Sequence, residues 1–300
     1  MKRIVTPTLP DIGTVRNMIY ALRGRYLFLD AMPFGHSVLK REIYSLTLGN
    51  GKQRILFAAA FHAQEWITAL LLLRLCEDMC EALQTDTPLS GIDLRRALYG
   101  RSVTFVPVVN PDGVEIALHG SRSAQCYADT VHKLGGDIPG AWQANVCGID
   151  LNRNYDAGFE TARKAAAALG IIAPAPRRFG GTVAAGEPET QAMIRLCKLL
   201  EPRHVMALHT QGEEIYWQYG KHTPPRSRIM AEVMAASSGY TACNPEAVAS
   251  HAGFKDWFIE TFRRPGFTVE CGKGENPLPL SDFEPLYSRL QELFLLTALM

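Results

Sequence analysis

An apolar run at residues 54–61 is followed almost at once by a leucine-rich segment at residues 66–83, and this pair constrains the fold more than any other feature of the chain. The run contains Ile55–Ala60 without a break, which is typical of a buried β-strand. The leucine-rich segment predicts a long helix packed on the sheet that contains this strand. A buried strand that leads directly into a helix favours an α/β fold.

The rest of the chain continues this alternation. Strands are expected at residues 42–48, 54–61, 103–109, 204–209 and 267–270, and helices at residues 11–23, 66–83, 186–200, 226–236, 254–262 and from 283 onward. We expect the first two strands to form a hairpin around Gly49–Gly51. We therefore expect residues 1–300 to form a single α/β domain with a mixed, mostly parallel central sheet flanked by helices. In this domain, residues 1–50 supply a leading helix and the first strand region.

Composition narrows the class of partner. Lys and Arg total 31 against 30 acidic residues, so the net charge is close to zero, and 47% of the residues are hydrophobic. A balanced charge does not favour a nucleic-acid binder or a polybasic membrane anchor. No uncharged apolar run reaches about 18 residues, so we expect no membrane span. A small or neutral partner fits this composition best.

The cysteines and the amino terminus indicate a compartment. Seven cysteines are scattered along the chain, without paired spacing apart from Cys76 and Cys80 on one predicted helix. This odd number does not favour a disulfide framework. Met1–Arg3 is basic but is followed by Thr6, Pro7 and Pro10 rather than by the apolar core of a signal peptide. We expect a cytoplasmic protein.

Three of the predicted strands end in a polar residue that could serve a reaction. His62 and Glu65 follow the strand at 54–61, while His209 and Glu270 end two later strands. Open α/β sheets place their sites at the carboxyl ends of strands. Two histidines and one carboxylate are a ligand set of catalytic zinc, which keeps its fourth position for water. The alternative for His62 and Glu65 alone is a strand-end histidine hydrogen-bonded to a nearby acid.

Glu270 lies where a general base is needed. Zinc lowers the pKa of a bound water to about 7, and a carboxylate can take the proton and pass it to the leaving amine. Glu270, after an apolar strand, is suited to this role, and its alternative is an exposed acid at the end of a strand. The expected cofactor is one Zn²⁺ ion.

A series of ordered motifs resembles those of the carboxypeptidase A-type zinc metallopeptidases. The motifs, in chain order, are His62–Trp66, Asn110–Gly113, Asp150–Asn154, Glu187–Thr190, His209, Lys255–Trp257 and Phe267–Glu270. The resemblance spans nearly the whole chain. Within that family, residues 253–259 and 270–279 look most like the bacterial γ-D-glutamyl-meso-diaminopimelate peptidases, which cut the stem peptides of peptidoglycan.

The resemblance implies roles for individual residues. It implies that His62, Glu65 and His209 bind zinc and that Glu270 is the base. A second set is implied to bind substrate: Asn152 and Arg153 would hold a substrate carboxylate, and Lys255 falls at the base of the specificity pocket. A planar guanidinium suits a carboxylate because it donates two hydrogen bonds at once. Lys255 would read one charged end of diaminopimelate and a nearby acid the other; the alternatives for Arg153 and Lys255 are solvent-exposed side chains.

Two features of the family are missing at their expected positions. Relatives carry a basic residue that stabilises the oxyanion, but residues 142–148 contain no arginine or lysine. The alternatives are that Arg122 or Arg153 substitutes or that the enzyme is slow. The tyrosine that pancreatic enzymes bring over the substrate falls on Val248 here, with His251 and Tyr240 as nearby candidates.

The expected activity is hydrolysis of the γ-D-glutamyl-meso-diaminopimelate amide in murein peptides, with a free tripeptide as the favoured muropeptide. A general zinc carboxypeptidase that removes C-terminal residues is the first alternative. The missing basic residue leaves open a second, a catalytically weak muropeptide-binding protein.

Overall fold

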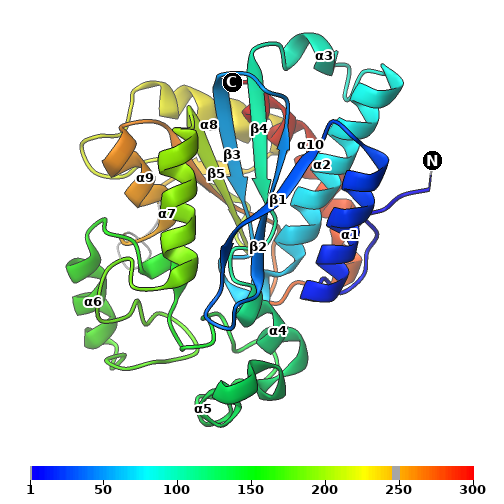
Figure 1. Ribbon diagram of the computed structural model, residues 1–300. Coiled ribbons are helices and arrows are strands. Elements are labelled where there is room, and N and C mark those ends of the chain that lie inside the picture. The colour runs from blue at the N-terminus through cyan, green and yellow to red at the C-terminus, as the bar shows by residue number, and fades with distance from the viewer. Residues whose placement is uncertain (1, 245–250) are drawn as a thin grey trace.

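Eight strands form one mixed sheet with helices on both faces in the computed structural model, which describes residues 2–244 and 251–300 (Figure 1). The strands are β1 (Asp30–His36), β2 (Glu42–Leu48), β3 (Gln53–Ala58), β4 (Arg101–Val106), β5 (His204–His209), β6 (Glu214–Tyr216), β7 (Thr241–Cys243) and β8 (Gly266–Glu270). Their order is β1-β2-β4-β3-β5-β8-β6-β7. The four central strands β4, β3, β5 and β8 are parallel, and antiparallel strands flank them on both sides. The expected fold class is confirmed.

The helices cover the two faces of the sheet in separate groups. The helices are α1 (Ile12–Arg25), α2 (Ile67–Thr85), α3 (Leu94–Ala97), α4 (Pro111–His119), α5 (Ala128–Lys133), α6 (Phe159–Ala168), α7 (Pro188–Leu200), α8 (Arg226–Ser238), α9 (Phe254–Phe262) and α10 (Phe283–Leu299). Helices α1, α2, α8 and α10 share one hydrophobic core, and α7 and α9 share the other. No helix in the described part of the chain is both long enough and apolar enough to cross a bilayer.

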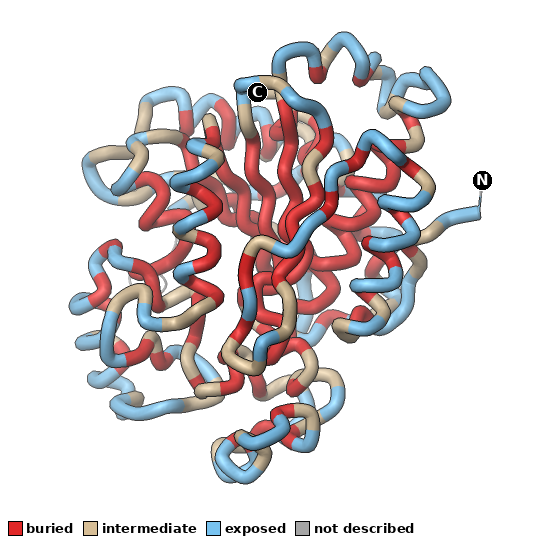
Figure 2. Tube along the Cα trace, in the orientation of Figure 1, coloured by how far each residue is buried: buried red, intermediate tan, exposed pale blue. Residues whose placement is uncertain are grey.

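Strand β3 shows why the central strands read as continuous apolar runs. Ile55 and Phe57 belong to the core beneath α2, while Leu56 and Ala58 belong to the core beneath α7 and α9. Successive side chains of a strand point to opposite faces, so a strand with two covered faces needs apolar residues at every position. Figure 2 shows this burial as a continuous red centre, which includes most of α2.

The predicted hairpin between residues 42–48 and 54–61 is wrong. Strand β4 lies between β2 and β3, and β2 instead forms a hairpin with β1. Strand β1 was not predicted because it contains Pro33 and Gly35, which are tolerated at an edge and at a bulge between these two residues. Strand β3 pairs with the parallel strands β4 and β5 on its two edges, so β2 is not its neighbour in the sheet. Helices α3, α4, α5 and α6 and strands β6 and β7 were also not predicted.

The parallel centre of the sheet brings the predicted polar strand ends together. Strands β3, β5 and β8 are adjacent and run in the same direction, so their carboxyl ends meet at one edge. His209 and Glu270 are paired residues in the β5–β8 register. The segment that carries His62 and Glu65 follows directly after β3.

Candidate metal centre and active-site cavity

Three side chains converge at the carboxyl edge of the sheet. Oε1 of Glu65 lies 2.9 Å from Nδ1 of His62, and Oε2 lies 2.9 Å from Nδ1 of His209. The two ring nitrogens are 3.2 Å apart, and one ligand atom from each of the three residues lies within 4.8 Å of the others. Two imidazole nitrogens and a carboxylate oxygen that face one point are a donor set suited to Zn²⁺. The residues therefore fit the metal that the sequence predicts.

A tight turn after β3 places two of these ligands. Ala60 adopts a left-handed conformation with φ of 48°, and its backbone amide donates to the Thr68 hydroxyl over 3.0 Å. The same hydroxyl donates to the carbonyl of Glu65 over 2.7 Å. A short 3₁₀ turn at Ala63–Glu65 then returns the Glu65 side chain to His62. This turn brings two side chains that are three residues apart in the sequence to the same point.

The charges around His62 favour a cation. Burial disfavours the imidazolium form, but the carboxylates of Glu65 and Asp150 outweigh burial and raise the pKa of His62 to about 10. Burial alone would raise the pKa of Glu65, yet His62 and His209 lower it to about 2. Two ionised carboxylates beside one partly buried imidazole make a negative site. A divalent cation would replace the proton that this site otherwise holds.

Asp150 and Asn152 support the far sides of the two imidazoles. Oδ1 of Asp150 lies 3.2 Å from Nε2 of His62, and Nδ2 of Asn152 lies 3.4 Å from Nε2 of His209. Asp150 also accepts hydrogen bonds from the backbone amides of Asn152 and Arg178. Burial acts to raise the pKa of Asp150, but His62, the charge of Arg153 and the amide of Arg178 lower it to about 2. A carboxylate in this position orients a metal-binding histidine and increases its basicity.

A cavity of about 100 Å³ lies beside the three ligands. It is lined by His62, Gln143, Asp150, Asn152, Arg153, Tyr216, Gly253, Lys255, Asp256, Thr268 and Glu270. It therefore brings together five of the residues singled out from the sequence, which lie far apart in the chain. Burial, reinforced by the carboxylate of Glu65, raises the pKa of Glu270 well above its usual value.

Lys255 is buried rather than directed to solvent. The residue is 5% exposed, and its Nζ donates to the backbone carbonyl of Gln218 over 2.9 Å and to the carboxylate of Asp256. Asp256 is 3% exposed and accepts a second hydrogen bond, 3.1 Å long, from the backbone amide of His251. One wall of the cavity thus carries a cation and an anion side by side.

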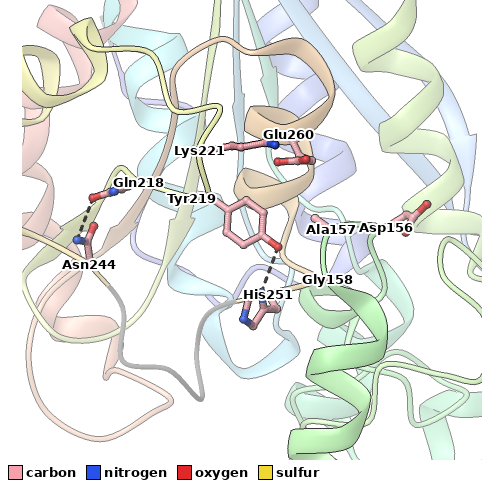
Figure 3. Close-up of a pocket in the computed structure, with 10 residues that line it drawn as sticks. Asp156, Ala157, Gly158, Gln218, Tyr219, Lys221, Asn244, His251 and Glu260 are labelled. Carbon is pink, nitrogen blue, oxygen red and sulfur yellow. Dashed lines mark hydrogen bonds between the residues drawn. The ribbon is translucent and has the colours of Figure 1, made fainter.

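The candidates for the family's tyrosine lie elsewhere. His251 lines a larger neighbouring cavity of about 730 Å³, where its Nδ1 is 3.1 Å from the hydroxyl of Tyr219 (Figure 3). Tyr240 is buried, and its hydroxyl accepts a hydrogen bond from the amide of Gly272. Val248 lies outside the described residues.

Besides Gln143, five residues of the cavity wall had no role in the sequence interpretation: Asp150, Tyr216, Gly253, Asp256 and Thr268. Asp150 was visible as the first residue of the Asp150–Asn154 motif, and Thr268 is two residues before Glu270, hence on the same face of β8. No local signal marked Tyr216. Gln143 was noted only as part of a segment without a basic residue, and it lines the cavity. Of the two arginines considered as substitutes for the oxyanion donor, Arg153 also lines the cavity, whereas Arg122 is exposed and is not a lining residue.

The Asn110–Gly113 motif is a scaffold for the site. The side-chain amide of Asn110 donates to the carbonyls of Phe61 and Ala144, while its Oδ1 accepts from the amide of Gly113. A Cβ atom on Gly113 would lie 2.4 Å from the carbonyl oxygen of Ala144, so only glycine fits there. This motif connects the segment before His62 to the segment that carries Gln143.

Comparisons with known proteins agree with the geometry. The family model described as zinc carboxypeptidase matches residues 17–292. Gamma-D-glutamyl-L-diamino acid endopeptidase 1 from Lysinibacillus sphaericus is 36% identical over 287 residues, which cover 95% of this chain and 71% of the relative.

Solved structures show the same fold. The structure of thrombin activatable fibrinolysis inhibitor matches with a TM-score of 0.78 and 17% identity, covering 99% of this chain and 76% of the other. Murein-tripeptide amidase MpaA from Escherichia coli O157 matches with a TM-score of 0.53 and 18% identity, covering 89% of each chain. The family match over most of the chain, together with the 36% identity, shows that this protein belongs to the zinc carboxypeptidase family.

Proposed function

We propose that this protein is a zinc-dependent peptidase that hydrolyses the amide between γ-D-glutamate and meso-diaminopimelate in murein peptides. The observation that carries this proposal is the buried Lys255–Asp256 pair in the wall of the cavity that also contains His62 and Glu270. The side chain of diaminopimelate ends in a carboxylate beside an amine, and a paired lysine and aspartate present the complementary charges. The name of the L. sphaericus relative supports the same class of substrate.

His62, Glu65 and His209 would hold the zinc ion. Bound zinc supplies a Lewis acid for the scissile carbonyl and lowers the pKa of the attacking water. Asp150 keeps His62 oriented through its contact with Nε2. Asn152 contacts His209 and also accepts a hydrogen bond of 2.9 Å from the amide of Phe254, so its own orientation is fixed.

Glu270 moves the proton. As a carboxylate it accepts a proton from the attacking water, and as a carboxylic acid it returns that proton to the leaving amine nitrogen. Its raised pKa suits both halves of this cycle, because a base with a very low pKa is a weak proton acceptor. The leaving amine belongs to diaminopimelate.

Arg153 and Asn152 would anchor a carboxylate of the diaminopimelate residue. Both line the cavity next to Lys255 and Asp256. In the free tripeptide, the carboxylate nearest the leaving amine is the chain terminus, which the guanidinium can bind through two hydrogen bonds. The side chain then extends toward the Lys255–Asp256 pair.

Gln143 is our candidate for the missing oxyanion donor. It lines the cavity in the segment where relatives carry a basic residue. Its backbone is fixed because its carbonyl accepts from the amide of Ala63 over 3.0 Å and its amide donates to the carbonyl of Pro176 over 2.9 Å. A side-chain amide that lines the same cavity as His62 can donate a neutral hydrogen bond to developing negative charge.

The cytoplasm is the proposed compartment, and a free muropeptide the proposed substrate. All seven cysteines are unpaired, and Cys126 is exposed, which suits a reducing environment. In that setting the enzyme would act on murein fragments rather than on the intact wall.

The proposal is tested with L-alanyl-γ-D-glutamyl-meso-diaminopimelate, incubated with and without a chelator and analysed by mass spectrometry. We expect release of free diaminopimelate, abolished by the chelator and restored by Zn²⁺. Intact tripeptide in both samples would refute the proposal, and binding without cleavage by a zinc-free protein would favour a muropeptide-binding protein. Removal of an ordinary C-terminal residue from a plain peptide at a similar rate would favour a general carboxypeptidase.

A further inference from the structure

A basic pocket of about 320 Å³ lies at the amino-terminal ends of the central strands, and the metal centre lies at their carboxyl ends. It is lined by Lys52, Gln53, Arg54, Leu200, Glu201, Arg203, Arg226 and Arg264. Five of these residues are cationic and one is acidic, in a chain whose total charge is close to neutral. This local excess of positive charge is not part of the peptidase site.

The basic pocket and the metal centre are built on the same three strands. Arg54 is the second residue of β3, Arg203 directly precedes β5, and Arg264 lies two residues before β8. These strands end at the segments that carry His62, His209 and Glu270. Strands of about six residues span about 20 Å, so a ligand in this pocket does not overlap a substrate at the metal.

Two of the arginines have a structural role at the end of α7. Arg54 Nη1 donates to the carbonyl of Leu200 over 3.0 Å, and Arg264 Nη1 donates to the carbonyls of Glu201 and Pro202 over 2.6 and 3.0 Å. Cations stabilise the carboxyl end of a helix by binding its free carbonyls. Each guanidinium has five donors, so these bonds leave several directed elsewhere.

Arg203 and Arg226 are not explained by the helix end. Arg203 Nη1 donates to the side chain of Gln53 over 3.1 Å, and Arg226 Nη2 donates to the carbonyl of Arg203 over 3.2 Å. Arg203 Nε is buried and has no hydrogen-bond partner. Among the described residues, no carboxylate forms an ion pair with any of the four arginines. Burial and the charges of Arg203 and Arg264 lower the pKa of Arg226, so the cluster is strained by like charges.

We infer that this pocket binds the phosphate group of a small soluble ligand. A doubly charged tetrahedral anion would relieve the repulsion among the arginines and accept hydrogen bonds from the N–H groups that they leave unused toward the pocket. Guanidinium groups match phosphate because they donate through two parallel N–H groups. The volume lies at the lower end of the range for small-molecule pockets, about 300 to 1,000 Å³, which suits a phosphate or diphosphate. This inference is independent of the proposed peptidase activity.

The test is calorimetric binding of inorganic phosphate, inorganic pyrophosphate and uridine diphosphate to the full chain at constant ionic strength. The variant is R203Q/R226Q, which removes two charges but keeps the bonds of Arg54 and Arg264 to the end of α7. The matched control is R16Q/R23Q, which removes two exposed charges from α1. Thermal unfolding of both variants verifies that they are folded.

We expect saturable binding of at least one of the three phosphates, weakened tenfold or more in R203Q/R226Q and unchanged in R16Q/R23Q. Tighter binding of uridine diphosphate than of pyrophosphate would identify an esterified phosphate as the natural ligand, and the reverse order would identify a free one. Either order supports the inference. Absence of saturable binding at millimolar concentration would overturn it, as would equal affinity in R203Q/R226Q, which would place the anion elsewhere, for example at the metal.

Discussion

His209 and Glu270 are directly opposite each other in the register of the parallel strands β5 and β8. Adjacent parallel strands put paired residues at the same height, so an imidazole and a carboxylate emerge at one edge of the sheet. Glu214 of β6 is the antiparallel partner of Glu270 on its other side, but it does not line the catalytic cavity. This arrangement places two glutamates side by side, and Glu270 is the one that lines the cavity.

The variant E270Q is expected to lose about 100- to 10,000-fold in kcat, because the amide has no basic oxygen that can accept the proton. Zinc content and KM should change little, since Glu270 is not among the converging ligands. The control is E214Q, for which we expect less than a tenfold change. Equal losses in the two variants would contradict the assignment of Glu270 as the base.

The contact between Asp150 and His62 predicts an effect on metal affinity. The variant D150N keeps the shape of the side chain but removes the negative charge 3.2 Å from Nε2 of His62. Loss of such a partner costs about 10- to 100-fold in metal affinity. Competition with a chromogenic chelator measures the zinc affinity, and D156N, which changes an exposed carboxylate, is the control. Unchanged affinity in D150N would show that Asp150 only supports the surrounding loop.

The meeting of polar side chains at one end of the sheet was predictable because each of them follows a local pattern. His62, His209 and Glu270 come at or just after apolar strands, and parallel strands of one sheet must end at a common edge. The boundaries of β5 and β8 and the cap of α1 by Asp11 also agree with local patterns. In these cases a short stretch of neighbouring residues is enough to predict the end of the strand or the cap of the helix.

Features that depend on distant contacts were not predictable in this way. The hairpin prediction failed because β4, which lies about 50 residues further along the chain, pairs with both β2 and β3 and so separates them. The partner of Lys255 could have been any nearby acid, and only the packing of α9 shows that it is Asp256. Gln143 carries no distinguishing pattern, and its place in the cavity depends on bonds to Ala63 and Pro176.

Gln143 is expected to stabilise the transition state without contributing much to substrate binding. The variant Q143A should lower kcat by about 100- to 1000-fold, the cost of one oxyanion donor, with little change in KM. The control is Q191A, which removes an exposed glutamine on α7. If kcat in Q143A remained within threefold of the wild-type value, the donor would have to be sought elsewhere, with Arg153 as the next candidate.

The Lys255–Asp256 pair predicts discrimination between diaminopimelate and lysine. These two residues differ by the side-chain carboxylate, which Lys255 would bind. A hydrogen bond to a charged group is worth about 1.5–3 kcal/mol, so the ratio of kcat/KM for the two tripeptides should fall by about 10- to 100-fold without it. The variant K255M/D256N is preferred to K255A because it does not leave the Asp256 charge buried alone. An unchanged ratio would refute the specificity role of Lys255.

His204 predicts a loss of stability in acid that is unrelated to the metal. It is fully buried, its Nε2 donates to the carbonyl of Thr297 over 2.7 Å, and its Nδ1 has no partner. Burial, together with the charges of Arg226, Arg203 and Arg101, lowers the pKa of His204 to about 4 despite the opposing bond to Thr297. A proton added at Nδ1 would have no acceptor and would face these arginines.

The sign follows from proton binding in the two states. The unfolded chain, in which a histidine has a pKa of about 6.5, binds the proton more readily than the folded chain, so this stability is complete above about pH 6.5 and is lost as the pH falls toward 4. The loss at pH 4 is about 3 kcal/mol in the free energy of unfolding. Urea unfolding between pH 7.5 and 4 measures it, with a chelator in every sample so that zinc release does not contribute. The variant H204Q should lack this component, because glutamine can donate to Thr297 without titrating. Parallel pH profiles for the two proteins would mean that another group controls acid stability.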